Sequence, residues 1–262
     1  MPRANRHYTP GQVWHITHRC HKRDFLLGFR KDRRRWQHRL FEAKKRFGLQ
    51  VLNYTITSNH IHLLVVDGEE REVLPRSLQL IASRTGQEYN HRKKRQGAFW
   101  EDRYHATAVE SGEHFVRCLI YIDLNMVRAG VVGHPSEWQE CGYHEIFNPP
   151  QRYAIINHQK LVELAMVQNL KEFKNSYAGW LQEMQPSLGK GREDKWSSSI
   201  AVGSEEFVTK IKLLLGIKAE GRNIVKTTGG ASELREASSS YNSVFMLENG
   251  CLSIENSYYW DF

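Results

Sequence analysis

Hydrophobic and polar positions along the first half of the chain alternate with the periods of strands and helices. Residues 13–19 are β-branched and aromatic, which predicts a strand. Across 31–47, apolar residues recur every three or four positions, which predicts a helix that ends at Gly48. Residues 49–57 and 59–66 then predict two further strands.

A second round of the same pattern follows. Apolar spacing over 78–89 predicts a helix that runs into the basic turn 91–97, and 99–109 alternates as a strand does. A last helix is expected over 113–129, ending at Gly130. The order βαββαβ plus a helix predicts an α+β fold of the ferredoxin-like type, an antiparallel sheet with helices on one face.

The character of the chain changes after two adjacent prolines, so we expect two domains, residues 1–150 and a mostly helical C-terminal extension, residues 151–262. A short helical stretch is expected over 161–170, and Ser204 is a good N-cap for another helix. Asn249-Gly250 is a strong hairpin signal. The helices of the extension could bind DNA or a partner, although an amphipathic helix more often packs against the rest of its own protein.

Two histidines one residue apart lie within the apolar run 59–66. Side chains alternate across a strand, so His60 and His62 share one face. The alternation of side chains does not show which face of the sheet carries the two histidines. Tyr121 and Asn125 stand four apart, which places them on one face of the last helix. We expect the histidines beneath that helix, because only this placement brings Tyr121 within reach.

Two imidazoles, a carboxamide and a tyrosine indicate metal-assisted phosphoryl transfer on nucleic acid. Imidazole points to Mn²⁺ or a softer metal, while carboxamide and phosphate oxygens suit Mg²⁺ or Mn²⁺. Tyrosine as nucleophile forms a covalent phosphotyrosyl intermediate, and with a free pKa of about 10 it needs help losing its proton.

Two other hydrolase classes fit the motif less well. A histidine-triad hydrolase needs a third alternate histidine, where this chain has Leu64. A zinc hydrolase usually has a cysteine or carboxylate cluster near its histidines, and Asp67 is the one acid close downstream.

Positive charge is concentrated where these motifs lie. The chain holds 37 Lys and Arg against 29 Asp and Glu, a net charge of +8. Residues 1–150 hold 24 basic and 16 acidic side chains, and residues 151–262 hold 13 of each. A basic field over the first region attracts polyanions such as DNA.

The four cysteines are far apart and form no Cys-x-x-Cys pair, which argues against a zinc knuckle or a disulfide framework. The first residues lack the apolar core of a signal peptide, and no run of about 18 apolar residues follows. We therefore expect a cytoplasmic protein that does not enter a membrane and that joins the nucleoid when bound to DNA.

Three stretches of the sequence resemble motifs of a known superfamily. Residues 59–62 resemble the His-hydrophobic-His motif of single-tyrosine HUH-type transposases. Residues 121–132 closely resemble the tyrosine helix of the REP-associated tyrosine transposases within that superfamily, and 99–104 resembles the strand before it. The similarity covers about residues 8–147. One departure is Met126, where the family commonly has proline; we expect it to alter local helix geometry rather than chemistry.

The resemblance implies a ferredoxin-like domain that nicks single-stranded DNA beside a small REP-like hairpin, with Mg²⁺ or Mn²⁺ as cofactor. It implies that Tyr121 attacks the phosphate, leaving a 5′-phosphotyrosyl link and a free 3′-hydroxyl. His60 and His62 would be metal ligands, with Asn125 the third. Both a monomer and a dimer stay open, since some relatives exchange the tyrosine helix between subunits.

Single-strand binders combine a cationic groove with aromatic platforms. The candidate DNA-binding residues near the motifs are Arg19, Lys22, Arg103, Arg128 and Trp100.

Two alternatives stay open. A catalytically inactive nucleic-acid-binding protein could keep the fold, against which the intact histidines, tyrosine and asparagine argue. A transcriptional regulator could act through residues 151–262, against which the zero net charge of that region argues.

Overall fold

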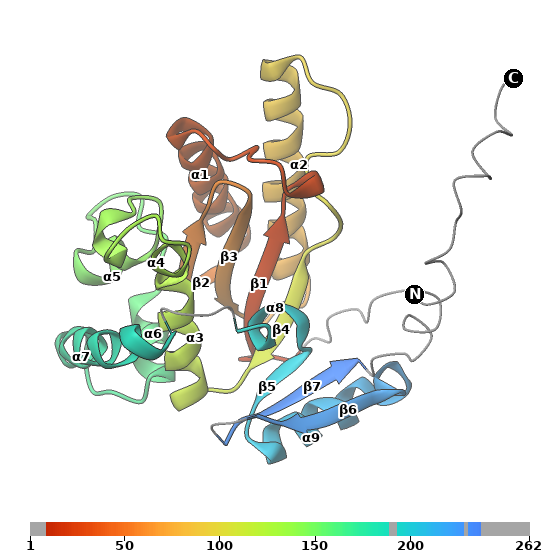
Figure 1. The fold of residues 1–262 in the computed structure, drawn as a ribbon, viewed down its shortest axis with the longest axis vertical. Coiled ribbons are helices and arrows are strands. Elements are labelled where there is room, and N and C mark those ends of the chain that lie inside the picture. Colours follow the sequence, from red (N-terminus) through yellow and green to blue (C-terminus); the bar gives the residue numbers. More distant parts are fainter. Residues whose placement is uncertain (1–8, 189–192, 228–229, 237–262) are drawn as a thin grey trace, which may run out of the picture.

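The computed structural model of the protein describes residues 9–188, 193–227 and 230–236 (Figure 1). The hairpin expected at Asn249-Gly250 lies outside these ranges. Within them, no helix is both long enough and apolar enough for a membrane span.

Residues 13–109 form the predicted βαββαβ unit. Its strands pair antiparallel in the order β2-β3-β1-β4, which confirms the ferredoxin-like arrangement. The last strand is shorter than expected, because residues 99–104 form a loop that joins the sheet by one isolated bridge, Cys20 to Trp100. The elements are β1 (Val13–Arg19), α1 (Arg30–Phe47), β2 (Gln50–Ile56), β3 (His60–Val66), α2 (Val73–Lys93) and β4 (His105–Val109).

The helix expected over 113–129 is present in two pieces, α3 (Glu113–Asp123) and α4 (Asn125–Arg128), which are separated by the buried Leu124. Helix α3 covers the face of the sheet opposite to α1 and α2 (Figure 1). The sheet therefore lies between two layers of helices.

The C-terminal extension is mostly helical, as predicted, but it also supplies three short strands. They extend the sheet to seven strands in the order β2-β3-β1-β4-β5-β7-β6, with β5 parallel to β4. The elements of the extension are α6 (His158–Leu164), α7 (Leu170–Leu188), α8 (Lys195–Ser198), β5 (Ala201–Gly203), α9 (Glu205–Leu215), the 3₁₀ turn η3 (Gly216–Ala219), β6 (Arg222–Lys226) and β7 (Ser232–Glu236). Before it, the 3₁₀ turn η1 (His21–Arg23) follows β1, and the 3₁₀ turn η2 (Pro135–Glu137) and α5 (Tyr143–Phe147) follow α4.

Helix α9 begins as the sequence predicted. The Ser204 hydroxyl accepts a hydrogen bond from the Phe207 amide at 3.2 Å. Its apolar face packs against β5, β6 and β7 rather than being left open for DNA. The buried positions of this helix are Val208, Ile211 and Leu215.

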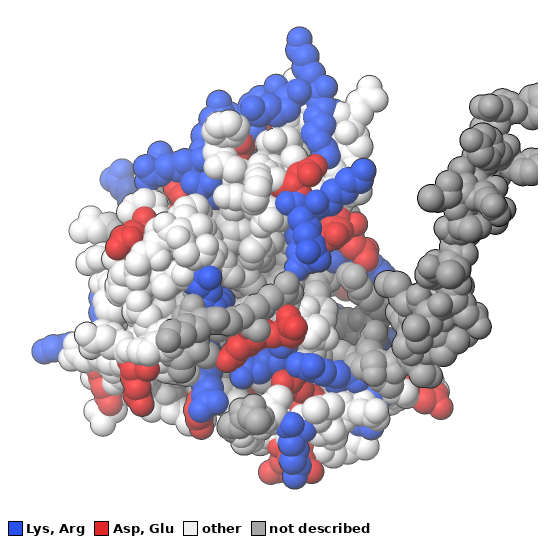
Figure 2. Space-filling model, in the orientation of Figure 1, with Lys and Arg blue, Asp and Glu red and all other residues white. Residues whose placement is uncertain are grey.

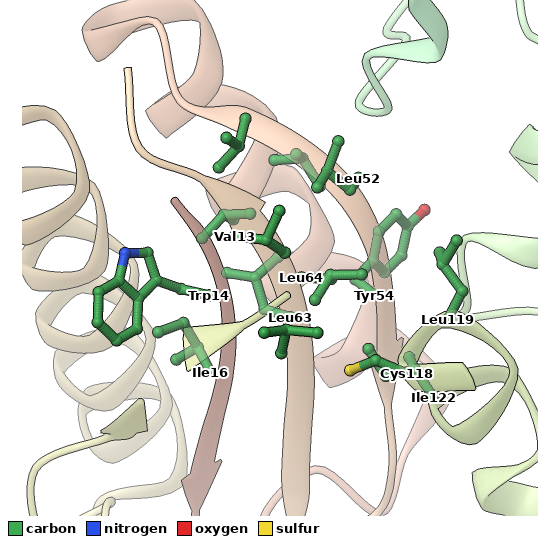
Figure 3. Packing of buried hydrophobic residues seen from close by; sticks show 14 of the residues in the cluster. Val13, Trp14, Ile16, Leu52, Tyr54, Leu63, Leu64, Cys118, Leu119 and Ile122 are labelled. Atoms are coloured by element: carbon green, nitrogen blue, oxygen red, sulfur yellow. The ribbon is translucent and has the colours of Figure 1, made fainter. Parts of the chain in front are cut away.

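The core fixes β3 from both sides (Figure 3). Leu63 lies opposite Ile16 in the β1–β3 register, on the face toward α1 and α2, and Leu64 lies on the other face with α3. Both leucines are fully buried. Burying a leucine contributes about 1.5–3 kcal/mol, so a one-residue slip of β3 would be costly. The positions of His60 and His62 follow from this register.

Candidate active site

The helix α3–α4 and the strand β3 bring four predicted site residues together. Asn125 Nδ2 lies 2.9 Å from His62 Nε2. The Tyr121 ring meets the His62 ring edge to face, with 5.8 Å between centroids. The rings of His60 and His62 are 5.0 Å apart. The expectation that the histidines lie beneath the last helix is confirmed.

A chain of hydrogen bonds fixes the ring of His62. His15 Nδ1 lies 2.8 Å from the Trp196 carbonyl oxygen, and His15 Nε2 lies 2.8 Å from His62 Nδ1. A carbonyl oxygen only accepts, so His15 donates from Nδ1 and accepts at Nε2. His62 must then donate from Nδ1, which leaves its lone pair on Nε2. Burial lowers the pKa of His15 to about 3, consistent with this neutral form.

His60 has the same tautomer for a different reason. Its Nδ1 lies 2.7 Å from Asn59 Oδ1 and 2.9 Å from the Thr57 hydroxyl. The Thr57 hydroxyl donates to the His60 carbonyl at 2.9 Å, so it accepts from the ring. With the proton on Nδ1, the lone pair of His60 also lies on Nε2.

This donor set fits a divalent cation. Both imidazoles carry their lone pair on Nε2, and their other nitrogens are held by fixed partners, as is usual for metal-ligating histidines. A 180° rotation of the Asn125 side-chain amide would place its oxygen, in place of Nδ2, beside His62 Nε2. In the described part of the chain, no three His, Cys, Asp or Glu residues form a ligand cluster. A third protein ligand would therefore be a carboxamide.

Tyr121 is enclosed from two sides. The guanidinium carbon of Arg128 lies 3.9 Å from the centre of its ring, and the Trp196 ring lies 5.9 Å away on α8. Tyr121 is 3% exposed. The two terminal amino nitrogens of Arg128 are buried without a hydrogen-bond partner, and burial lowers the pKa of this guanidinium. The guanidinium lies on the Tyr121 ring, and its two terminal nitrogens are donors that an anion at this place would accept from.

A buried polar network anchors the end of α3 that carries Tyr121. The Asp123 carboxylate accepts hydrogen bonds from Asn53 Nδ2 on β2 at 2.9 Å and from the Tyr177 hydroxyl on α7 at 2.5 Å. Burial raises the pKa of Asp123 to about 7. These bonds tie the tyrosine helix to the sheet on one side and to the extension on the other.

The predicted DNA-binding residues are more widely spread. Arg19 lies opposite His60 in the β1–β3 register and pairs with Glu101 at 3.8 Å. Lys22 and Arg103 are exposed. Trp100 lies on the α2 side of the sheet, where its indole donates to the Ala82 carbonyl at 3.0 Å. It is therefore on the opposite face from Tyr121.

Sequence reasoning missed His15 and Trp196. His15 lies between the apolar residues Trp14 and Ile16 and shares a strand face with Thr17, and this alternation was the signal for a buried polar role. Trp196 lies in a polar segment with no periodicity, so the sequence held no signal for it.

Residues 10–124 match the family model described as "Transposase IS200 like". A solved structure of a REP-associated tyrosine transposase bound to a REP hairpin is 18% identical over 57% of this chain and 87% of that chain, with a TM-score of 0.48. A candidate transposase from Deinococcus radiodurans R1 is 15% identical over 44% of this chain and 89% of that chain, with a TM-score of 0.33. Among curated proteins, none matches this chain.

Proposed function

Because residues 10–124 match the family model of IS200-like transposases, we propose that the protein is a metal-dependent single-stranded DNA endonuclease and strand transferase. It cleaves beside a hairpin and forms a 5′-phosphotyrosyl intermediate. One observation carries the proposal: Tyr121 and Asn125 lie against His62, whose lone pair is held on Nε2 by the bond to His15.

In the proposed reaction, the Tyr121 oxygen attacks the phosphorus of the scissile phosphodiester. The new bond joins the phenol oxygen to phosphorus, and the broken bond releases the 3′-oxygen, which takes up a proton. The phenol loses its proton to water or a nearby base. Attack by another 3′-hydroxyl on the phosphotyrosyl group reverses these steps and transfers the strand.

The surrounding residues have separate roles in this scheme. Arg128 would receive the non-bridging phosphate oxygens with its unpartnered amino groups. A Mg²⁺ or Mn²⁺ ion held by His60, His62 and Asn125 would supply neutralisation of the charge on the phosphate. The burial of Tyr121 adds a requirement: side chains packed around it, among which are Arg128 and Trp196, have to move before DNA reaches the phenol.

Covalent capture tests the nucleophile. Wild-type protein, Mn²⁺ and a hairpin oligonucleotide with single-stranded flanks should give a protein–DNA adduct on a denaturing gel, and Tyr121→Phe should give none while still binding the DNA. Tyr89→Phe on α2 is the matched control and should retain the adduct. Equal adduct from Tyr121→Phe and wild type would refute the assignment.

The same gel tests the metal. His60→Ala and His62→Ala should each lose the Mn²⁺-dependent adduct, because each removes one imidazole ligand. Cleavage that continues in a chelator would contradict the metal site.

A further inference from the structure

Two phenylalanines stand exposed in one short turn between η1 and α1. Phe25 is 72% exposed and Phe29 is 65% exposed. Of the three residues between them, Leu26 and Leu27 are buried and Gly28 is exposed. The turn thus directs its leucines into the core and its aromatic rings outward, although exposure of large apolar rings opposes folding.

The turn is held firmly, so the rings are presented at fixed places. The Gly28 amide donates to the Phe25 carbonyl at 3.0 Å, and the Leu27 amide donates to the Ser58 carbonyl at 2.9 Å. Arg33 Nη1 donates to the carbonyls of Leu27 and Gly28 at 3.1 and 2.8 Å. A Cβ at Gly28 would lie 2.9 Å from the Phe25 carbonyl oxygen, which shows how tightly the turn closes.

Basic residues lie in and beside the turn. Lys93 Nζ lies 5.1 Å from the centre of the Phe29 ring. Figure 2 shows Lys and Arg side chains gathered where α1 begins and α2 ends. Asp24 is the acid within the turn. Within the described residues, no ion pair engages the basic side chains of the turn and its neighbours, Lys22, Arg23, Lys31, Lys93 and Lys94.

The turn is also tied to the candidate active site. Asn59, the residue before His60, donates from Nδ2 to the Arg23 carbonyl at 3.2 Å. The Asn59 carbonyl accepts from the Cys20 amide at 2.8 Å. The backbone of the turn therefore adjoins the end of β3 where the first metal-binding histidine is proposed, and the Phe29 ring lies beside Lys93 of α2.

We propose that Phe25 and Phe29 form a platform on which unpaired bases next to the cleaved phosphate stack. This inference rests on the proposed function. Every base offers a π-face to an aromatic ring, and the unpaired cations would neutralise the neighbouring phosphates. A second copy of this chain would bring the same positive charge to the platform, so charge complementarity favours a polyanion.

Binding measurements test the platform apart from catalysis. The protein carries Tyr121→Phe, so no cleavage occurs, and the two probes are one hairpin with single-stranded flanks and the same hairpin with blunt ends. Phe25→Ala and Phe29→Ala should each weaken binding of the flanked hairpin about 10-fold and leave the blunt hairpin unchanged, because one stacked base is lost.

Tyr153→Ala is the matched control, since Tyr153 is also 72% exposed but packs on Phe41 of α1. It should bind both probes as the parent does. Phe25→Trp should retain binding of the flanked hairpin, because indole also stacks. Unfolding midpoints close to that of the parent show that the variants fold.

Two results would overturn the platform: unchanged binding of the flanked hairpin, or equal weakening for both probes, which would place the contact on the duplex. The failure of the proposed function looks different. In that case wild-type protein gives no Tyr121 adduct, whatever the two phenylalanines do to binding.

Discussion

Replacing His15 by leucine tests whether the hydrogen-bond chain from Trp196 prepares His62 for metal binding. Leucine fills a similar volume but has no polar atom. His62 Nδ1–H then loses its acceptor and the Trp196 carbonyl loses its donor. Each buried polar group left without a partner costs about 1–3 kcal/mol, so the free energy of unfolding should fall by about 2 kcal/mol or more.

The effect on the metal is separate from the effect on stability. Without His15, the His62 ring can carry its proton on Nε2, which blocks the proposed ligand atom. Loss of such an outer partner typically costs 10–100-fold in metal affinity. We therefore expect the dissociation constant for Mn²⁺ to rise by about that factor in His15→Leu. His15→Gln, which keeps one donor and one acceptor, should recover most of the affinity.

Calorimetric titration of Mn²⁺ into each protein measures the affinity, and ¹⁵N spectra of the histidine rings report the tautomer of His62 directly. The wild-type ring should carry its proton on Nδ1, and the leucine variant should show a mixture. If His15→Leu binds Mn²⁺ as tightly as wild type and its His62 tautomer is unchanged, the chain of hydrogen bonds has no role in preparing the site.

Two further predictions concern charge. Arg128→Met should slow adduct formation about 100-fold, the cost of removing one donor to a reacting anion, with Arg128→Lys in between; an unchanged single-turnover rate would exclude a role for Arg128 at the phosphate. Burial lowers the pKa of His18 to about 4, with the Asp102 carbonyl as its hydrogen-bond partner. An unfolded histidine titrates near 6.5. Between about pH 6.5 and pH 4 the unfolded state therefore binds more protons than the folded state, and the free energy of unfolding falls as the pH is lowered. Urea unfolding should show that lowering the pH from 7 to 4.5 reduces the free energy of unfolding of the wild-type protein by up to about 3 kcal/mol more than that of His18→Phe. An equal reduction in the two proteins would show that His18 does not titrate in this way.

Much of the proposed site could be predicted because it depends on local periodicity. Alternation along β3 places His60 and His62 on one face, and a spacing of four places Tyr121 and Asn125 together on a helix. The element order predicted the sheet of residues 13–109, since short connections and right-handed crossovers leave few ways to pack βαββαβ. The β3 histidines, the tyrosine helix and the βαββαβ sheet could be predicted because each depends on residues or elements that are close together in the sequence.

The remaining features depend on pairings that no period encodes. Strand β5 has three residues, too few to show alternation, and it joins the sheet beside β4. Residues 99–104 alternate as a strand does, but Trp100 bonds to Ala82 on α2 and the segment becomes a loop. The partner of His15 is 181 positions away. A signal of that kind is visible only once the chain is folded.

The boundary expected at residue 150 separates the motifs from the extension in sequence but not in the construction of the site. Thr107 on β4 donates to the Ser199 carbonyl at 2.7 Å, which holds the end of α8 against the sheet. From there Trp196 supplies both the acceptor for His15 and a ring beside Tyr121. A chain cut at residue 150 would leave the buried His15 Nδ1–H without its acceptor and the phenol without its cover. The extension therefore helps to set the tautomer of His62 and the burial of Tyr121, whatever else it binds.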